Sequence, residues 1–520
     1  MRFFTGDPNP HFFNWPTLYM YVLAGVFAAY GVALRLTEGA SAVAAFVRDP
    51  AGFYLLARVV AALLGTVTVG LTYLAGVRLG GRAIGLAAAF FLAVNLQHVV
   101  DSHFATTDIP VTFLVLATVL ASVGYWERGR ARDGFLSGLL GGLAATAKYN
   151  GGLVGVVFVV AHLLRARETG APWRATLGSR VIPVWLGGAL LGFLAGTPFA
   201  ALAPREFARG LFGEVRAIST VQLGNEGDLP GLLFHLLHSL PQAMGVAPLL
   251  CVGLGLVVAL RRRAPEDWLL LAFPLPYLLI IGTWASRFER YAVPLLPFAS
   301  ILAALGLAAA TWRLPTLAPA RRGFAFAVAA LVVAAPVVAR VLYFEVLLTR
   351  PDSRELAGAW IERNVSPGAR VAIEPYSLPI AGSVVDQVRG LHRATSPQVN
   401  IPTRLRRSQP EASPAGGVRV YALGAFEFEY DLDVLRTHRI EYVVLSSFMY
   451  KRYVDACGTF PVACGFYRDL DARATLVHEV RPIAEGRPLW VGDIYAPASQ
   501  VFARERPGPI IKIYRLSNAP

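Results

Sequence analysis

Long apolar runs, separated by short polar connectors, occupy the first two thirds of this chain. Several of them approach the roughly 20 residues that an α-helix needs to cross a bilayer. We therefore expect a polytopic α-helical membrane protein with ten or eleven apolar segments. These segments are residues 15–36, 53–77, 83–96, 109–126, 135–147, 151–164, 181–202, 240–260, 268–284, 291–312 and 324–348.

The pattern changes after residue 348, where the apolar runs give way to the mixed composition of a soluble domain. Residues 353–364 predict an amphipathic helix, with Leu356, Trp360 and Ile361 on one face. Residues 1–348 are thus predicted to form a multi-span membrane domain, and residues 349–520 a small α/β domain. Strands are expected at 370–374, 418–422, 442–446, 474–480 and 509–516, helices at 431–438 and 448–454, and a loop at 382–417.

Composition agrees with a membrane protein. Hydrophobic residues make up 55% of the 520 residues and charged residues only 16%, whereas soluble proteins average about 25% charged residues. The net charge of +14 would suit a nucleic-acid partner, but the arginines gather in short clusters between apolar runs. That placement is typical of cytoplasmic membrane loops, so no nucleic-acid partner is expected.

The uneven distribution of arginine and lysine between alternating loops predicts the orientation. One set of loops holds fifteen of these residues, and the other set, which includes Lys148 and Arg290, holds six. The fifteen are Arg78, Arg82, Arg128, Arg130, Arg132, Arg165, Arg167, Arg174, Arg180, Arg261, Arg262, Arg263, Arg313, Arg321 and Arg322. We expect the first set to be cytoplasmic. The second set and the domain at 349–520 are then extracytoplasmic, in a multi-pass protein of the cell membrane.

Residues 15–36 have two interpretations. The segment is long enough to span the bilayer, but Pro16, Arg35 and three tyrosines also suit an interfacial or re-entrant helix. Loop charge does not decide between them, because Arg2 is the only lysine or arginine ahead of the segment.

A polar stretch at 97–108 interrupts the apolar runs and carries Asp101, His103 and Asp108. Titratable groups at the ends of membrane helices are costly unless they face water, a partner or a substrate. The stretch is either a functional site or an ordinary connector, and these residue types favour a functional site.

Lys148 lies between two further apolar runs, and in a chain with only three lysines a functional role is favoured over that of an ordinary loop lysine. Both features lie on the predicted outer face.

Two further residue pairs have candidate roles elsewhere. His235 and His238 are spaced to share one helix face, but no third ligand lies near them in sequence, which disfavours a metal site. Cys457 and Cys464 lie in the predicted external domain, where a disulfide is permitted. Two reduced thiols in the core are the alternative.

Four motifs resemble those of lipid-carrier-dependent glycosyltransferases. They are Gly-Asp-Pro-Asn-Pro-His-Phe-Phe-Asn-Trp-Pro-Thr-Leu-Tyr at 6–19, Asp-Ser-His-Phe-Ala-Thr-Thr-Asp at 101–108, Thr-Ala-Lys-Tyr-Asn-Gly at 146–151 and Arg-Tyr-Ala-Val-Pro-Leu-Leu-Pro at 290–297. In this order they resemble the protein O-mannosyltransferase and aminoarabinose-transferase superfamily, also called glycosyltransferase family 39, with the C-type glycosyltransferase fold. The likeness runs through most of residues 6–297, and the tail is similar to the external α/β domains of some members.

The resemblance implies transfer of a sugar from a polyprenyl-phosphate donor in the membrane lipid to an extracytoplasmic glycan, lipid or protein acceptor. Inversion at the anomeric carbon needs a carboxylate that takes the acceptor's proton and cations that stabilise the departing phosphate. Asp101 and Asp108 are the candidate catalytic carboxylates. The candidate substrate-binding residues are Asp7, His11, His103, Lys148, Tyr149, Asn150, Arg287, Arg290 and Tyr291. No cofactor is assigned, and a divalent metal ion stays an open alternative.

The chain departs from the family at its beginning. In the family an acidic pair usually precedes the motif at 6–19 and supplies the base, whereas here that motif follows Met1 closely. We favour a natural start that lies upstream and supplies a further span. The alternatives are that the chain is inactive, or that Asp7 or Asp101 has taken the role. The family's external placement of residues 6–16 would leave residues 15–36 outside the membrane and ten spans in the chain.

A transporter or a carrier-lipid flippase is the competing interpretation, because such proteins also carry polar residues among membrane helices. Transporters tend to show internal repeats, with broken helices in corresponding halves. No repeat is evident here, and the titratable residues gather at one predicted membrane face. A transferase is therefore preferred. A non-enzymatic scaffold would leave the external cluster unexplained.

Overall fold

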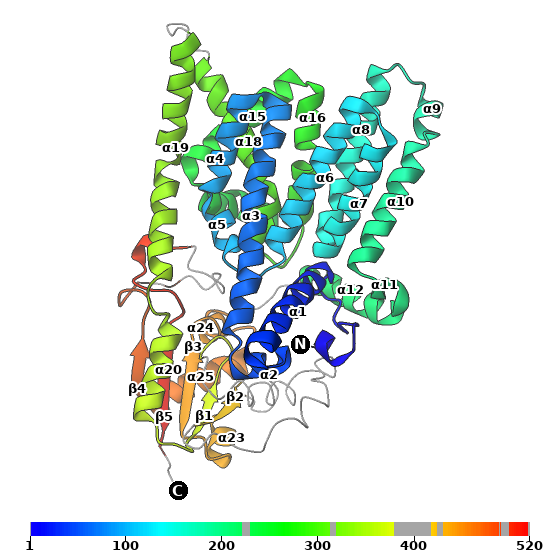
Figure 1. The fold of residues 1–520 in the computed structure, drawn as a ribbon. Helices are drawn as coiled ribbons and strands as arrows, with labels where there is room; N and C mark the ends of the chain where they lie inside the picture. Colours follow the sequence, from blue (N-terminus) through cyan, green and yellow to red (C-terminus); the bar gives the residue numbers. More distant parts are fainter. Residues whose placement is uncertain are drawn as a thin grey trace. The chain divides into compact units, whose positions relative to one another are not determined.

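The computed structural model describes residues 2–220, 229–312, 319–378, 418–423, 430–487, 489 and 499–517 (Figure 1). The chain divides into two compact units. Asn9–Thr220 and Asp228–Val341 form the first, and Leu342–Pro520 with Met1–Pro8 belong to the second. The loop expected at 382–417 lies outside the described residues.

The first unit is built from helices, as the apolar runs predict. Eight helices in the described ranges are long and apolar enough to cross a membrane, or up to ten if each of two bent pairs is one span. The prediction of a polytopic helical membrane protein is confirmed. The elements are α1 (Leu18–Glu38), α2 (Ala42–Arg48), α3 (Ala51–Gly80), α4 (Arg82–Ala93), α5 (Leu96–Ser102), α6 (Asp108–Arg128), α7 (Ala131–Ala147), η2 (Tyr149–Val154), α8 (Gly155–Glu168), α9 (Trp173–Leu177), α10 (Val181–Gly196), α11 (Phe199–Leu202), α12 (Pro204–Ser219), α13 (Gly231–Phe234), η3 (His235–Ser239), α14 (Leu240–Met244), α15 (Val246–Arg262), α16 (Pro265–Leu271), α17 (Pro274–Gly282), η4 (Glu289–Leu295), α18 (Leu296–Trp312) and α19 (Pro319–Leu348).

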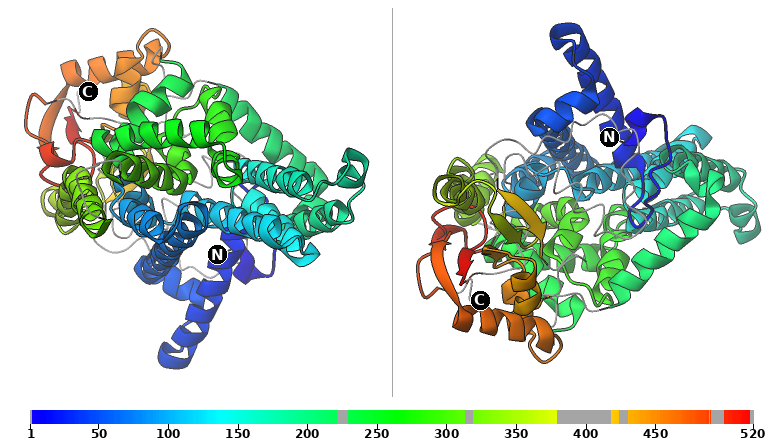
Figure 2. Two further views of the ribbon diagram at one scale, coloured as in Figure 1. Left: turned by 90° about the horizontal axis from the view of Figure 1, so that it is seen from above. Right: turned by 90° about the horizontal axis from the view of Figure 1, so that it is seen from below.

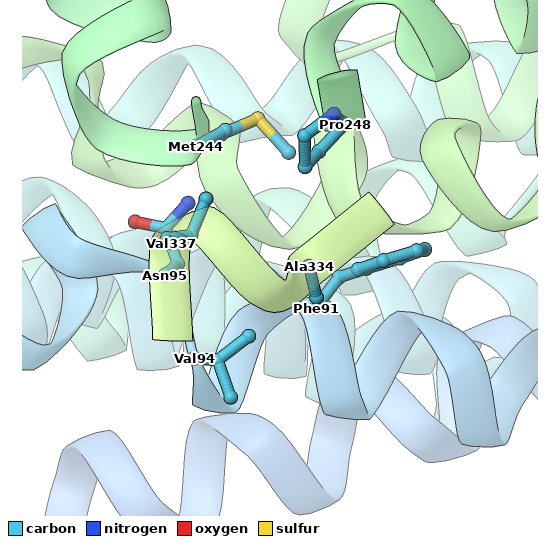
Figure 3. Close-up of a pocket in the computed structure, with 7 residues that line it drawn as sticks. All are labelled: Phe91, Val94, Asn95, Met244, Pro248, Ala334 and Val337. Atoms are coloured by element: carbon cyan, nitrogen blue, oxygen red, sulfur yellow. The ribbon is translucent and has the colours of Figure 1, made fainter. Parts of the chain in front are cut away.

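Two of the apolar segments are bent at short breaks. Helices α4 and α5 meet at an angle of 61°, and the segment α13–α14 meets α15 at 118°. The side chain of Asn95 starts α5 by accepting a hydrogen bond from the His98 amide. The break directs α5, which carries Asp101, away from the axis of α4. Figure 3 shows the residues that line a small pocket at these breaks: Phe91, Val94, Asn95, Met244, Pro248, Ala334 and Val337.

Helices α7 and α10 approach each other closely because glycines line both facing surfaces. A Cβ atom at Gly142 would lie 2.2 Å from the carbonyl oxygen of Ala189, and one at Gly192 would lie 2.1 Å from that of Leu139. Small residues permit such approach between membrane helices, where van der Waals packing drives association. This packing fixes α7, and Lys148 is the residue that ends it.

Helix α1 corresponds to the ambiguous segment at 15–36. Its length and apolar composition would allow it to cross a membrane. Figure 2 looks along the helical bundle and shows α1, at the blue end of the colour bar, running lengthwise and projecting outward. This direction favours the interfacial interpretation over a span parallel to the others.

The second unit contains a five-stranded sheet in the order β2-β1-β3-β5-β4. Strand β1 pairs in parallel with β2 and β3, and β5 pairs antiparallel with β3 and β4. All five predicted strands are present, within two residues of their expected ends. The elements are α20 (Ser353–Asn364), β1 (Arg370–Ile373), β2 (Arg419–Ala422), α23 (Leu432–Thr437), β3 (Tyr442–Ser446), α24 (Tyr450–Asp455), α25 (Pro461–Arg473), β4 (Ala474–Val480), η5 (Val501–Ala503) and β5 (Ile511–Leu516).

Alternation along the strands gives this sheet two apolar faces. Val371 and Ile373 join Ala357 and Ile361 of α20 in one core. The intervening Ala372 faces the other core, which includes residues of α23 and α25. A period of two along a strand therefore places a helix layer on each face of the sheet.

Helix α25 is absent from the elements predicted by sequence. Ala463, Phe466, Tyr467 and Leu470 recur at helical spacing and are buried in the core, so the signal was present but short. A disulfide joins Cys457 to Cys464 with a Cα–Cα distance of 5.3 Å. The two cysteines are therefore joined in a disulfide and are not two reduced thiols.

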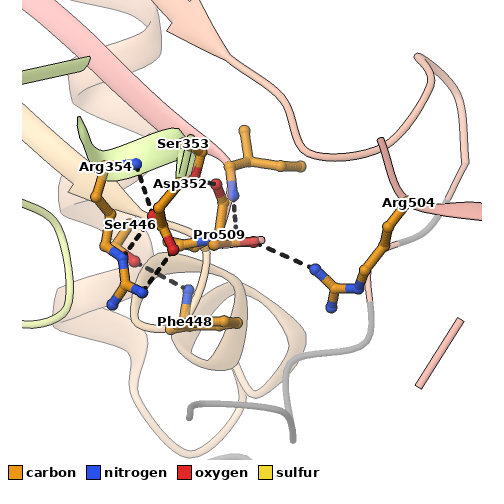
Figure 4. Close-up of polar contacts among 10 residues, drawn as sticks. Asp352, Ser353, Arg354, Ser446, Phe448, Arg504 and Pro509 are labelled. Atoms are coloured by element: carbon orange, nitrogen blue, oxygen red, sulfur yellow. Dashed lines mark hydrogen bonds and ion pairs between the residues drawn. The ribbon is translucent and has the colours of Figure 1, made fainter. Parts of the chain in front are cut away.

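Polar contacts fix the start of α20 against the segment that leads into β5 (Figure 4). Asp352 caps the helix by accepting from the Arg354 amide at 2.8 Å, and the Arg354 guanidinium donates to both of its carboxylate oxygens. The Ser353 hydroxyl donates to the Pro509 carbonyl oxygen at 2.6 Å, and Arg504 donates to the Gly508 carbonyl. The Asp352 contact satisfies an amide at the helix end that would otherwise be left without a partner.

Glu374 follows β1 and is buried in this unit, with 1% of its surface exposed. Its carboxylate accepts hydrogen bonds from the Ser446 amide at 2.8 Å and from the Tyr467 hydroxyl. Burial nevertheless raises the pKa of Glu374 from 4.5 to about 8. Between these two pH values the folded state holds a proton that the unfolded chain has lost.

Stability of this unit should therefore fall as pH rises from about 5 to about 8, because the folded state binds more protons over that range. The expected loss is on the order of a few kcal/mol. Glu374→Gln should remove most of this pH dependence. Thermal unfolding of both full-length proteins from pH 5 to pH 9 measures the effect, and parallel pH profiles for the two would contradict it.

Candidate functional site

A buried ion pair joins two of the residues predicted from sequence. The Lys148 ammonium lies 2.6 Å from Oδ1 of Asp108, and only 2% of Asp108 is exposed. Asp108 occupies the first turn of α6, where the helix dipole favours a negative charge. Lys148 lies in extended conformation between α7 and η2, which directs its side chain out of the helical repeat. The pair therefore joins two helix ends that are 40 residues apart in sequence.

Aromatic rings of the segment that contains η4 flank this pair. The Lys148 ammonium lies 4.7 Å from the centre of the Tyr291 ring. The Arg290 guanidinium lies 4.6 Å from the centre of the Phe288 ring and 6.0 Å from that of Tyr291. Cations over aromatic faces are stabilised by the ring quadrupole. Two cations thus lie around one tyrosine ring.

A hydrogen-bond chain connects η2 to η4. The Asn150 amide donates to the Tyr277 hydroxyl at 2.8 Å, and that hydroxyl donates to the Tyr291 carbonyl oxygen at 3.1 Å. Tyr277 is fully buried and was not predicted from sequence, because it lies within an apolar segment. The chain gives Asn150 a positioning role in the described structure.

Asp101 lies close enough to the same charges to interact with them. It is 6% exposed, and the Gln97 side chain donates a hydrogen bond to it at 2.6 Å. Its carboxylate interacts electrostatically with Asp108, Arg290 and Lys148. The structure therefore brings both predicted carboxylates to the two cations.

His103 ends α5, and its Nδ1 atom lies 2.8 Å from the Val99 carbonyl oxygen. This nitrogen therefore contacts the backbone of its own helix.

Tyr149 donates a hydrogen bond from its hydroxyl to the Phe13 carbonyl oxygen at 2.7 Å. Tyr149 thereby ties η2 to the motif at 6–19.

His11 contacts a residue that sequence reasoning did not single out. Its Nδ1 atom lies 2.8 Å from Oε2 of Glu206, which also accepts from the Asn9 amide at 3.2 Å. Glu206 and Glu214 both belong to α12. In the sequence they lie in a stretch of mixed charge between the apolar segments at 181–202 and 240–260, where a long external loop is expected, and their helical spacing is the signal that would have found them.

Arg287 donates to the backbone carbonyl of Leu229. Beside it, His238 Nε2 lies 3.1 Å from Oε1 of Glu289. The segment with His235 is a π-helix, in which His235 Nδ1 contacts the Ser239 hydroxyl at 3.0 Å. Within the described ranges, no three His, Cys, Asp or Glu side chains gather closely enough to hold a metal ion.

Asp7 belongs to the second unit, with Met1–Pro8. The other predicted site residues belong to the first.

Residues 52–199 match the family model described as dolichyl-phosphate-mannose-protein mannosyltransferase. No curated protein matches the chain by sequence. Among solved structures, the apo form of ArnT from Cupriavidus metallidurans is 15% identical over 96% of this chain and 88% of that protein, with a TM-score of 0.46. ArnT from the same organism bound to undecaprenyl phosphate is also 15% identical, over 98% of this chain and 89% of that one, with a TM-score of 0.45.

The apo oligosaccharyltransferase of Archaeoglobus fulgidus is 13% identical, with a TM-score of 0.46. The match covers 88% of this chain but spans only 65% of the length of that enzyme. These structural likenesses are too distant to indicate an activity. The family match over residues 52–199 includes two of the four sequence motifs, those at 101–108 and 146–151, and it supports the resemblance to the C-type glycosyltransferase superfamily.

Proposed function

We propose that the chain transfers a sugar from a polyprenyl-phosphate donor to a glycan, lipid or protein acceptor on the extracytoplasmic side of the membrane. The observation that carries this proposal is the buried Asp108–Lys148 pair beside Arg290 and Tyr291. Two cations at the ends of membrane helices suit a lipid-linked phosphate, whose charge stays at the membrane surface.

The cations would act on the leaving group. As the acceptor oxygen bonds to the anomeric carbon, its proton passes to a carboxylate base. The bond from that carbon to the phosphate oxygen breaks, and the electron pair stays on the phosphate. Lys148 and Arg290 stabilise the charge that develops there. Asp108 orients Lys148 through their ion pair, and the Asp101 carboxylate interacts electrostatically with both cations. Fixed groups of this kind need no rearrangement during the reaction.

Single displacement at the anomeric carbon predicts inversion. An α-linked polyprenyl-phosphate hexose or pentose should yield a β-linked product. Nuclear magnetic resonance of the product reads the anomeric configuration directly. A product with the configuration of the donor would exclude single displacement and require a covalent intermediate.

The extracytoplasmic placement is a separate prediction from arginine distribution. In a Cys251→Ala background, His103→Cys and Asp433→Cys should react with a membrane-impermeant thiol reagent in intact cells. Arg130→Cys should react only after the cells are opened. Labelling of position 130 but not of position 103 in intact cells would show that the predicted orientation is wrong.

A further inference from the structure

Helix α12 lies beside the end of the apolar helix α10. Non-helical backbone at Thr197 and Ala203 interrupts the path between the two helices, so α12 does not continue α10 (Figure 1). The Phe207 ring centre lies 6.1 Å from that of Phe193, which belongs to the last turn of α10. Because α10 belongs to a segment that is long and apolar enough to cross a membrane, this contact holds α12 at the end of a membrane segment.

One face of α12 packs against the protein. The Phe207 ring centre lies 5.9 Å from that of Phe13 and 6.3 Å from that of Tyr149. A Cβ atom at Gly210 would lie 2.6 Å from Cβ of Phe13. Glu214 follows Phe207 by seven residues and therefore lies on the same face. This face of α12 is covered by the motif at 6–19 and by η2.

The opposite face of α12 carries a stripe of arginines. Arg205, Arg209 and Arg216 are spaced by four and seven residues, so they lie on one side of the helix, and all three are exposed. None of the three forms an ion pair with a residue that the structure describes. Glu206 of the same helix contacts His11 instead. The positive charge of α12 is therefore gathered on the side that faces away from the protein.

Large apolar side chains border these arginines. Phe212 lies three residues after Arg209 and is 70% exposed, and Val215, three residues further along, is 50% exposed. Leu202, at the end of α11, is 73% exposed. Arginines beside exposed phenylalanine and leucine are typical of a helix in the membrane interface, where the apolar side chains enter the upper acyl region and the cations meet the headgroups.

We propose that the arginine face of α12, made of Arg205, Arg209, Phe212, Val215 and Arg216, binds anionic phospholipid headgroups of the leaflet at which α10 ends. Charge selects this partner, because guanidinium groups donate paired hydrogen bonds to phosphate oxygens. Each arginine near an anionic membrane surface strengthens the attraction by about fivefold, and zwitterionic lipids offer no such net charge. This surface is separate from the proposed sugar transfer and does not depend on it.

A probe at position 219 reports on the arginine face, because Ser219 is exposed and follows Phe212 by seven residues. The full chain with Cys251→Ala and Ser219→Cys is labelled with a fluorescent thiol reagent, which the Cys457–Cys464 disulfide does not consume. It is then placed in vesicles of phosphatidylcholine and phosphatidylglycerol. A nitroxide near the headgroup end of the acyl chain quenches the probe. At equal amounts, nitroxide-labelled phosphatidylglycerol should quench at least about twice as strongly as nitroxide-labelled phosphatidylcholine.

Replacing all three arginines of the arginine face with glutamine should make the two lipids quench equally. The matched control replaces Arg130, Arg132 and Arg167 with glutamine, because these exposed arginines lie at the start of α7 and the end of α8, at the opposite ends of those helices from η2. The preference for phosphatidylglycerol should survive in the control. It should weaken in about 0.5 M salt when the arginines are intact, since ions screen the attraction. The salt series tests the proposal even where the triple variant fails to fold.

Equal quenching by the two lipids while the arginines are intact would overturn the proposal, and so would a preference that survives their replacement. Quenching by neither lipid would show that protein covers the arginine face, and it would also overturn the proposal. Oxidative cross-linking of Ser219→Cys between two chains would then identify a second copy as the occupant.

Discussion

Replacing Lys148 with methionine should reduce turnover at limiting donor by about ten- to a hundredfold. A hydrogen bond to a charged group is worth about 1.5–3 kcal/mol, and Lys148 is proposed to make one to the donor phosphate. The change should also destabilise the protein, because Asp108 would stay buried without its partner. Breaking a buried pair from one side costs about 3–5 kcal/mol.

The double variant Lys148→Met with Asp108→Asn separates these two effects. Removing both charges should restore most of the stability, since no buried carboxylate is left uncompensated. Donor use should stay impaired, because the cation is still absent. Thermal unfolding and donor kinetics of the three variants decide the matter. A double variant that regains wild-type turnover would limit Lys148 to a structural role.

Replacing Arg290 with methionine should likewise weaken donor use by about ten- to a hundredfold. Its guanidinium lies over Phe288 and Tyr291, so methionine can still pack against the rings. We therefore expect the KM for the donor to rise while the melting temperature changes little.

Arg174→Met is a matched control for Arg290, because Arg174 lies 5.5 Å from the centre of the Trp173 ring in α9, which is predicted on the opposite side of the membrane. It removes a similar contact between a cation and an aromatic ring and should leave donor kinetics unchanged. Equal losses in the two variants would point to a general effect on folding. An unchanged KM in Arg290→Met would remove Arg290 from the donor site.

Sequence alone predicted the helices and strands well, because their apolar periodicity reflects burial directly. It could not predict that Asp108 pairs with Lys148, since that contact depends on how α6 and α7 pack. It also did not predict that the Arg287 guanidinium binds the backbone at Leu229. Charge and spacing indicate which residues are costly to bury, but tertiary packing decides which partner satisfies each one.

The residues that sequence analysis missed were all missed for one physical reason: their partners are set by the fold. Tyr277 lies in an apolar segment, where a hydroxyl attracts little notice until its partners Asn150 and Tyr291 are placed. Glu206 and Glu214 lie in a region that reads as a loop, and only the formation of α12 aligns them with the motif at 6–19. The close packing of α7 on α10 likewise depends on glycines that face each other only in the folded chain.

Sugar transfer itself is tested most directly with a polyprenyl phosphate that carries a radiolabelled sugar, added to purified protein in lipid vesicles together with an envelope fraction as acceptor. We predict that the label leaves the lipid, that unglycosylated polyprenyl phosphate is released, and that the label appears in the acceptor fraction. The Lys148→Met, Asp108→Asn protein should show at most about a tenth of this transfer. Intact donor that only moves to the opposite leaflet would indicate a transporter, and it would contradict the account.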